Sequence, residues 1–365
     1  MLLTNRPASF KFFTTATLIS LFIVLCFNWY IWGLGSDGRF FDPFTDSRCS
    51  SDSGLVAAVS AVSAESSHAA VTVTLSPPPI VAPSPVTVTV TTSGTTTHTS
   101  APTAIPEKIW YKLGPKGLSD DAKEWTDSCL SKNPTYRHEF LTDASGDYYV
   151  KEYFAHRPDI IDTYLRLPIP ILKADLLRYL ILYAEGGIWS DLDVSCEDES
   201  IHNWIPEQYK ADTAVVVGLE FDMAWEDDDF LHSQFASWTI MAKPGSPHML
   251  MVINDILESM KYKAEEYNVS ISGLTTEMVG EVVDATGPKR MTRSIVKSME
   301  LELGEVVDDR NVSKLLEPRL IGDVLILPGN AFAASQSGYP DDEGPRLVTH
   351  HYAGTWKNDH GGEMA

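Results

Sequence analysis

The sequence lacks the short motifs that identify several common enzyme classes. Only four of its 365 residues are cysteine, and none forms a CxxC pair or a Cys/His zinc pattern. HExxH and GxSxG are absent as well, which argues against a metal-dependent or serine hydrolase. We find no internal repeat.

Positive charge is also scarce. The chain holds 28 Lys and Arg against 50 Asp and Glu, a formal net charge of −22. A nucleic-acid backbone or an anionic membrane surface needs clustered Lys and Arg, so neither is an expected partner. This acidity instead suits a protein that collects a divalent cation.

Charge is missing altogether from residues 12–34, which form an almost continuous apolar run long enough to cross a bilayer as a helix. Arg6 and Lys11 precede the run, and because basic residues prefer the cytoplasmic side, we expect residues 1–11 to be a cytoplasmic tail. A cleaved signal peptide is the alternative. We favour an uncleaved signal anchor, because the run exceeds the ~7 to 15 residues of a signal core and no small-x-small site follows closely.

Residues 35–104 contain few large apolar side chains and many Ser, Thr, Val, Ala and Pro. Such a segment cannot bury enough surface to offset its ordering entropy. We expect a disordered, O-glycosylated lumenal stem that holds the following domain away from the bilayer. A β-rich module is the alternative, which the prolines disfavour.

From Ile105 onward, short apolar runs alternate with helical patterns, which predicts an α/β domain over residues 105–365. The strands that we expect cover residues 108–111, 136–141, 188–190, 214–219, 237–242 and 324–327. The expected helices cover residues 119–131, 148–155, 160–167, 170–185, 247–260, 275–284 and 292–302, with Pro170 opening one helix and Gly186-Gly187 ending it.

Asp191 and Asp193 lie two residues apart at the end of a predicted strand. Ligands of α/β folds usually bind where strands leave the sheet. In an extended strand, residues i and i+2 point to one face, so both carboxylates would approach one cation. The alternative is a solvated loop, which is common for an isolated Asp-x-Asp pair.

Four segments occur in a characteristic order: Ile105–Trp110, Lys173–Tyr179, Gly186–Asp193 and Thr286–Pro288. Together they resemble glycosyltransferase family 32, the fungal α-1,6-mannosyltransferase type with a DXD sugar-binding region. The resemblance spans about residues 105–357. It implies a single-pass type II Golgi membrane protein with a GT-A fold, which is a Rossmann-like mixed sheet flanked by helices. It also implies retaining sugar transfer from a nucleotide donor, with Mn²⁺ or another divalent cation.

The resemblance assigns roles to individual residues. Asp193 matches the acid that binds the metal directly, and Asp191 matches the acid that touches the donor's ribose or sugar. Both are expected to be catalytic, with Asp191 as a further metal ligand. Asp175 and Arg178 match a helix pair that holds the donor sugar's hydroxyls and phosphate, and a simple intrahelical ion pair is the alternative. Trp110 would stack on or border the nucleotide base, unless it is a buried core residue.

The segment from His351 to Lys357 has the spacing H-x-x-G-x-x-K. Retaining GT-A enzymes of the glycogenin type have a similar segment. In those enzymes, the histidine at the position of His351 completes the metal shell. The glycine at the position of Gly354 lets the backbone approach a phosphate, and the lysine at the position of Lys357 contacts the diphosphate. His350 is the competing metal ligand, and a surface histidine pair without a role is a further alternative.

An acidic and aromatic stretch, residues 220–229, precedes Gln234 and Trp238. Aromatic faces stack on sugars and carboxylates bind hydroxyls, so we expect Trp225, Gln234 and Trp238 to bind the acceptor. A solvated charge run is the alternative.

The residues and the resemblance together predict a metal-dependent glycosyltransferase. The resemblance alone implies mannose transfer from GDP-mannose, and we expect a glycan acceptor of the N-glycan or mannan type and a complex with other Golgi transferases. Two alternatives stay open: transfer to an inositol-phosphate sphingolipid, and a non-catalytic lumenal carbohydrate-binding protein. The sequence does not settle whether Cys129 pairs with Cys196, nor whether the sequons at Asn268 and Asn311 are occupied.

Overall fold

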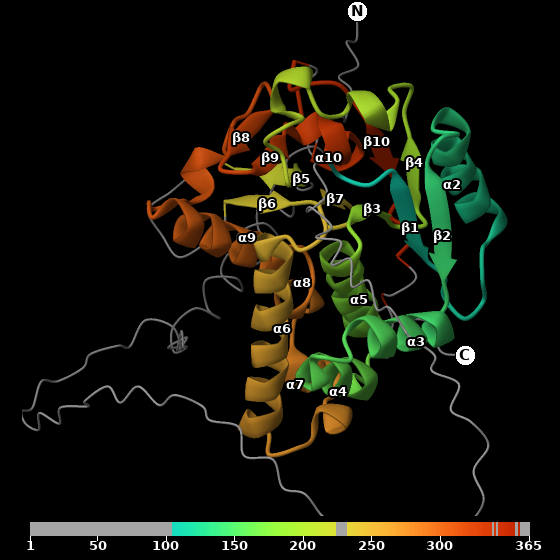
Figure 1. Cartoon of the computed structure of the whole chain (residues 1–365), viewed down its shortest axis with the longest axis vertical. Helices are drawn as coiled ribbons and strands as arrows, with labels where there is room; N and C mark the ends of the chain where they lie inside the picture. Colours follow the sequence, from blue (N-terminus) through green and yellow to red (C-terminus); the bar gives the residue numbers. More distant parts are fainter. Residues whose placement is uncertain (1–103, 224–231, 338, 341, 355–356, 358–365) are drawn as a thin grey trace, which may run out of the picture. The chain divides into compact units, whose positions relative to one another are not determined.

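A computed structural model of the chain describes residues 104–223, 232–337, 339–340, 342–354 and 357, and all of these belong to one structural unit (Figure 1). The unit is built on a mixed sheet with strand order β2-β1-β3-β7-β5-β9-β8, and β6 pairs with β5 outside this path. Strands β4 and β10 form a separate two-stranded sheet. The predicted α/β class is thus confirmed.

The elements have the following bounds. The strands are β1 Lys108–Lys112, β2 Arg137–Leu141, β3 Gly187–Ser190, β4 Val194–Cys196, β5 Val215–Asp222, β6 Ser233–Phe235, β7 Thr239–Ala242, β8 Arg319–Ile321, β9 Val324–Leu327 and β10 Val348–His350. The helices are α2 Asp120–Lys132, α3 Asp143–Tyr153, α4 Pro158–Arg166, α5 Pro170–Ala184, α6 Pro247–Glu266, α7 Thr276–Val279, α8 Val282–Ala285, α9 Pro288–Leu303 and α10 Gly329–Ser337.

Both faces of the central sheet are buried. Successive strand residues point to opposite faces, and they join different hydrophobic clusters: Trp110 packs in the larger cluster, whereas Ile109 and Tyr111 pack in the smaller one. This burial explains why the central strands are short, nearly continuous apolar runs, which is the pattern that made them predictable.

Several predicted boundaries change for local reasons. Helix α3 begins at Asp143 rather than Tyr148, because Thr142 and Ser145 form a capping box there. The predicted helix 275–284 is divided into α7 and α8 at Gly280, whose φ of 82° interrupts the helical backbone. Strands β4, β6, β8 and β10 and helix α10 were not predicted from the sequence.

The glycine pair after α5 places β3 between its neighbours. Gly186 and Gly187 have φ values of 68° and 100°, in the region that favours glycine. A Cβ atom on Gly186 would lie 2.7 Å from the carbonyl oxygen of Ala242, and one on Gly187 would lie 2.6 Å from that of Lys108. The pair therefore allows the close approach of β3 to β1 and β7.

Five strands of the sheet run in one direction. Strand β1 is parallel to β2 and to β3, β3 and β5 are both antiparallel to β7, and β5 is parallel to β9. The carboxyl ends of β1, β2, β3, β5 and β9 therefore lie at the same side of the sheet, which we call the carboxyl edge. The Asp191-Leu192-Asp193 segment follows β3 at this edge, where α/β folds usually bind ligands.

Within the described part of the chain, no helix is long and apolar enough to cross a membrane. The predicted anchor at residues 12–34, the cytoplasmic tail and almost all of the predicted stem lie outside the described residues.

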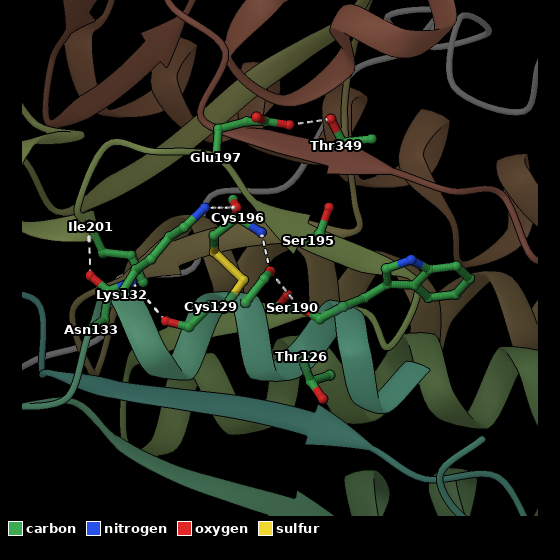
Figure 2. The surroundings of a disulfide bond; sticks show 12 residues. Thr126, Cys129, Lys132, Asn133, Ser190, Ser195, Cys196, Glu197, Ile201 and Thr349 are labelled. Carbon is green, nitrogen blue, oxygen red and sulfur yellow. Dashed lines mark hydrogen bonds between the residues drawn. A yellow bond between two sulfur atoms is a disulfide. The ribbon is translucent and has the colours of Figure 1, made fainter. Parts of the chain in front are cut away.

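A disulfide bond joins Cys129 of α2 to Cys196 of β4 (Figure 2), which resolves a pairing that the sequence left open. The Cα atoms of the two cysteines are 4.7 Å apart. Around the bond, the Cys196 backbone N–H donates to Ser128 Oγ at 2.9 Å, and Lys132 Nζ donates to the Cys196 carbonyl at 2.7 Å. These contacts attach β4 to α2 just beyond the Asp191–Asp193 segment.

Replacing both cysteines by alanine should lower the free energy of unfolding by about 2–4 kcal/mol, because the bond closes a loop across a sequence separation of 67 residues. Urea unfolding of the variant and of the wild-type chain measures the difference. The wild-type chain treated with a thiol reductant should show a similar loss. Equal stability of the oxidised chain and the variant would contradict this role.

Candidate functional site

The Asp191-Leu192-Asp193 segment forms a tight turn between β3 and β4. The Asp191 N–H donates to the Trp238 carbonyl at 2.9 Å, and the Val194 N–H donates to the Asp191 carbonyl at 3.2 Å. The segment is therefore not the extended strand end that we predicted. Burial raises the pKa of Asp191, the Arg178 charge opposes that rise, and the negative charge of Asp193 adds to it.

Arg178 connects two of the predicted acids. Its Nη1 donates to Asp175 Oδ1 at 2.9 Å, and its Nη2 donates to Asp191 Oδ1 at 3.2 Å. The Trp189 indole N–H donates to the same Asp191 oxygen at 2.7 Å. The ion pair within α5 that we considered as the alternative is thus present, but it is part of a network that reaches the Asp-x-Asp turn.

This network is largely shielded from solvent. The side chains of Asp175 and Arg178 are each 5% exposed, whereas that of Asp191 is 30% exposed. Burial raises the pKa of Asp175. Burial alone would lower the pKa of Arg178, but the negative charges of Asp191 and Asp175 hold it above its ordinary value. Arg178 is therefore a permanent cation that orients the Asp191 carboxylate.

The Thr286-Gly287-Pro288 segment holds the other side of Asp175. The buried Thr286 hydroxyl donates to Asp175 Oδ2 at 2.8 Å, and the Thr286 carbonyl accepts from the Tyr179 hydroxyl at 3.0 Å. A Cβ atom on Gly287 would lie 2.8 Å from Val283 Cα. The resemblance includes this segment but assigns no role to its residues. The structure shows that it holds the Asp175 carboxylate in place.

Pairing of β4 with β10 brings the C-terminal motif to the Asp-x-Asp turn. The antiparallel register places His350 opposite Val194 and Thr349 opposite Ser195. The Asp193 carbonyl accepts from the His351 N–H at 2.8 Å, and Asp193 Oδ2 accepts from the Ala353 N–H at 2.9 Å. Two segments that are distant in sequence therefore form one site.

The imidazole beside the Asp193 carboxylate belongs to His350, the competing ligand, rather than to His351. His350 Nε2 lies 3.3 Å from Asp193 Oδ1, and its ring stacks on Trp238 with centroids 4.3 Å apart. The His351 ring instead stacks on Trp125 at 4.3 Å, and its Nε2 lies 2.8 Å from Ser195 Oγ. Consecutive side chains in an extended chain point to opposite sides, so the two histidines separate.

Asp193 is an anion near neutral pH. Burial raises the pKa of this carboxyl, but the hydrogen bond and charge of His350 and the Ala353 N–H bring it below the ordinary value. The side chains of Asp193 and His350 are 19% and 11% exposed, so this pair lies near the surface of the site.

Gly354 and Lys357 of the C-terminal motif lie in one tight turn. Gly354 has a φ of 65° and accepts a backbone hydrogen bond from Lys357 at 3.0 Å, so this part of the motif is a tight turn that favours glycine. Lys357 is exposed. Its predicted contact with a diphosphate stays a prediction.

Three aromatic or polar residues are placed differently from their predicted roles. Trp110 is 0% exposed, donates to the Gly186 carbonyl at 2.9 Å and carries the Lys108 ammonium 3.4 Å above its ring, so it is a core residue with no free face for a base. Trp238 is buried and donates to the Phe332 carbonyl. Gln234 is buried and donates to Glu220. Trp225 lies outside the described residues.

The donor atoms at the turn fit a divalent cation. A carboxylate oxygen of Asp193 and the imidazole nitrogen of His350 are already adjacent, and ions of the manganese type accept both ligand kinds. Among the described residues, another group of potential ligands consists of His248, Glu302 and Asp323. Asp323 precedes β9, so that group lies at the opposite edge of the sheet.

Comparisons with known proteins identify the family of this chain. Residues 119–211 match the family described as "Glycosyltransferase sugar-binding region containing DXD motif". The chain is 32% identical over 265 residues to an initiation-specific alpha-1,6-mannosyltransferase of Schizosaccharomyces pombe, covering 70% of this chain and 64% of that protein. The match thus spans slightly less than two thirds of that relative.

A second relative is covered more fully. An initiation-specific alpha-1,6-mannosyltransferase of Candida albicans is 30% identical over 294 residues, which cover 71% of this chain and 74% of that protein. Among solved structures, the PaToxG glycosyltransferase has 15% identity and a TM-score of 0.34, covering 55% of this chain and 75% of that one. That structural similarity is slight, and the fold described above rests on the sheet topology. The chain belongs to the DXD-containing glycosyltransferase family that includes the initiation-specific alpha-1,6-mannosyltransferases.

Proposed function

We propose that this chain is a metal-dependent, retaining glycosyltransferase of the GT-A type that transfers mannose from GDP-mannose to a glycan acceptor. The observation that carries the proposal is the pairing of β4 with β10. This pairing brings the His350 imidazole to the Asp193 carboxylate, and the Arg178–Asp191 pair lies in the same turn after β3.

Asp193 and His350 would hold the cation, with Asp191 as a further oxygen ligand and His351 as the alternative imidazole. Mn²⁺ or a similar ion, when bound, neutralises the diphosphate charge of a nucleotide-sugar donor and stabilises the leaving group by several kcal/mol. Lys357 is the candidate for a second positive charge on the diphosphate, by analogy with its place in the H-x-x-G-x-x-K pattern.

The protein's own residues would orient the sugar. Arg178 and Thr286 fix the two oxygens of Asp175, and the same guanidinium fixes Asp191, so these acids cannot rotate freely when a donor arrives. Such preorganised groups lower the cost of holding a reactive geometry. No carboxylate is assigned as a nucleophile, so we favour attack of the acceptor hydroxyl on the same face from which the diphosphate leaves.

We also propose a cellular location and a donor for this protein. A disulfide between Cys129 and Cys196 is favoured in an oxidising compartment, which supports a lumenal position for the described domain. The proposed location is the Golgi membrane, with residues 12–34 as the anchor. GDP-mannose is favoured because the relatives are named mannosyltransferases.

The proposal is tested by incubating the full chain with Mn²⁺ and, separately, GDP-mannose, UDP-glucose, UDP-galactose and UDP-N-acetylglucosamine. We expect the chain to consume GDP-mannose. This activity should stop when EDTA chelates the metal and return when Mn²⁺ is restored. If no nucleotide sugar is consumed with any divalent ion, the non-catalytic carbohydrate-binding alternative replaces the enzyme.

A further inference from the structure

Three potential metal ligands meet at the edge of the sheet where β9 begins, opposite the carboxyl edge. They are the imidazole of His248 and the carboxylates of Glu302 and Asp323, and one ligand atom of each lies within 4.8 Å of the other two. His248 Nε2 is 2.6 Å from Asp323 Oδ1 and 3.3 Å from Glu302 Oε2. The proposed transferase function uses none of these residues.

The three ligands come from different elements, and each element has a defined position. His248 is in the first turn of α6, which the Ser246 side chain caps. Glu302 is in the last turn of α9. Asp323 is in the two-residue turn between β8 and β9, and its carbonyl accepts from the Ala214 N–H at 2.7 Å. The folded backbone therefore brings the three side chains together.

The imidazole is the buried member of the group. The His248 side chain is 1% exposed, whereas those of Glu302 and Asp323 are 47% and 30% exposed. A cation at this place would bind to the imidazole nitrogen on its inner side and to the two carboxylates on its outer side. The exposed carboxylates leave a path by which the cation can enter, and they leave room for water as a further ligand.

The negative charge of the group has no basic side chain to balance it. Within the described ranges, neither Glu302 nor Asp323 forms an ion pair with a Lys or an Arg. His248 lies at the N-terminal end of α6, whose partial positive charge disfavours an additional proton on the imidazole. Glu302 lies at the C-terminal end of α9, where the helix carbonyls favour a cation. A divalent cation would neutralise the two carboxylates.

The ligand types and their spacing suit zinc. Zinc accepts nitrogen and oxygen ligands together, whereas calcium and magnesium prefer oxygen ligands alone. Two ligand atoms on a tetrahedral zinc ion, each at about 2.0–2.1 Å, lie about 3.3 Å apart. His248 and Glu302 have this separation already, and His248 and Asp323 would have to move apart by about 0.7 Å.

The other imidazole nitrogen sets the expected affinity. His248 Nδ1 is buried and has no hydrogen-bond partner among the described residues. A metal-binding histidine usually donates its second N–H to an acceptor, and loss of that partner weakens metal binding about 10- to 100-fold. With three protein ligands and no such partner, we expect a dissociation constant of about 1 μM for zinc, weaker than that of closed structural zinc sites.

We propose that His248, Glu302 and Asp323 form a second metal site, which binds zinc and joins α6, α9 and the β8–β9 turn. Its role is structural, because zinc that binds the folded chain and not the unfolded chain stabilises the fold. The site lies at the opposite edge of the sheet from the Asp-x-Asp turn, so zinc binding here requires neither GDP nor transferase activity.

The test titrates Zn²⁺ into the metal-free, detergent-solubilised full chain by isothermal calorimetry, without GDP. Glu302→Gln keeps the size of an exposed side chain and removes its charge, and it should weaken binding of this zinc ion at least about tenfold. Asp323→Asn should have the same effect. Glu258→Gln, which removes one charge at an exposed position of α6, is the matched control and should bind as the wild-type chain does. Asp193→Asn should keep this zinc ion.

Two further readouts report where the ion binds. Zinc at a hundredfold excess over its dissociation constant should raise the Tm of the wild-type chain by about 5 °C, and it should not raise the Tm of Glu302→Gln by that amount. Co²⁺ in place of zinc should give the strong visible absorption of tetrahedral coordination with the wild-type chain and lose it with Glu302→Gln.

Equal zinc affinity and equal Tm shifts in the wild-type chain and in the folded Glu302→Gln and Asp323→Asn variants would overturn the proposal. So would an absence of zinc binding to the wild-type chain, which would leave the three residues as a hydrogen-bonded charge cluster only. Zinc binding that Asp193→Asn abolishes and Glu302→Gln retains would assign the ion to the Asp-x-Asp turn, and it would overturn the proposal as well.

Discussion

Replacing Asp193 by asparagine is expected to reduce kcat/KM for the nucleotide sugar by at least about a thousandfold, which corresponds to about 4 kcal/mol of transition-state stabilisation. The substitution removes the negative charge that lies beside His350, on which the proposed cation site depends. An amide oxygen can still accept the Ala353 N–H, so the turn should remain folded. Donor consumption, together with far-ultraviolet circular dichroism, measures both effects.

The matched control is Asp212→Asn, which removes one negative charge at an exposed position. It should keep both wild-type stability and wild-type donor consumption. An Asp193→Asn chain that consumed donor as fast as the Asp212→Asn control would show that Asp193 does not bind the metal.

Replacing Arg178 by methionine should destabilise the domain by about 3–5 kcal/mol, because it leaves Asp175 and Asp191 without their shared cation. Burial already raises the pKa of both carboxyls, and removal of Arg178 raises it further. A carboxyl with a folded pKa above its unfolded value binds more protons in the folded state, so stability falls as pH rises through this range. Part of the lost stability should therefore return when the pH is lowered from neutral toward 5.

Urea unfolding at pH 7 and pH 5 provides the measurement for Arg178→Met. Arg166→Met is the control, since Arg166 pairs with Asp162 on the exposed side of α4 and should contribute at most about 1 kcal/mol. A loss for Arg178→Met no larger than that of the control, or a larger loss at pH 5 than at pH 7, would contradict the described charge network.

The part of the site that is local in sequence could be predicted. Helix α5, the glycine pair and β3 are consecutive, and each carries its own signal: an apolar run opened by Pro170, two residues suited to positive φ, and a short buried strand. Because these elements follow one another directly, their order also placed Asp191 and Asp193 at the end of a strand. The turn itself required the structure, since a hydrogen bond between Val194 and Asp191 is not visible in the residue pattern.

The part that depends on distant pairing could not be predicted in detail. Ser195 and His351, which are hydrogen-bonded, are 156 residues apart, and β4 and β10 have three residues each. Such short strands give almost no periodic signal. A register shift of one residue would exchange the positions of His350 and His351, so the sequence motif alone could not identify the imidazole beside Asp193.

Aromatic residues were the least predictable. A tryptophan in a strand can equally pack in a core or border a ligand, and Trp110 and Trp238 both turned out to be buried against neighbouring elements.

The central claim is that the Asp-x-Asp turn binds a divalent cation together with a nucleoside diphosphate. Electron paramagnetic resonance of Mn²⁺, titrated into the full chain with and without GDP, tests it most directly. The account predicts that GDP strengthens Mn²⁺ binding to the wild-type chain, and that Asp193→Asn removes this bound ion while Asp212→Asn keeps it. Equal Mn²⁺ binding by the wild-type and Asp193→Asn chains, whether GDP is present or absent, would contradict it.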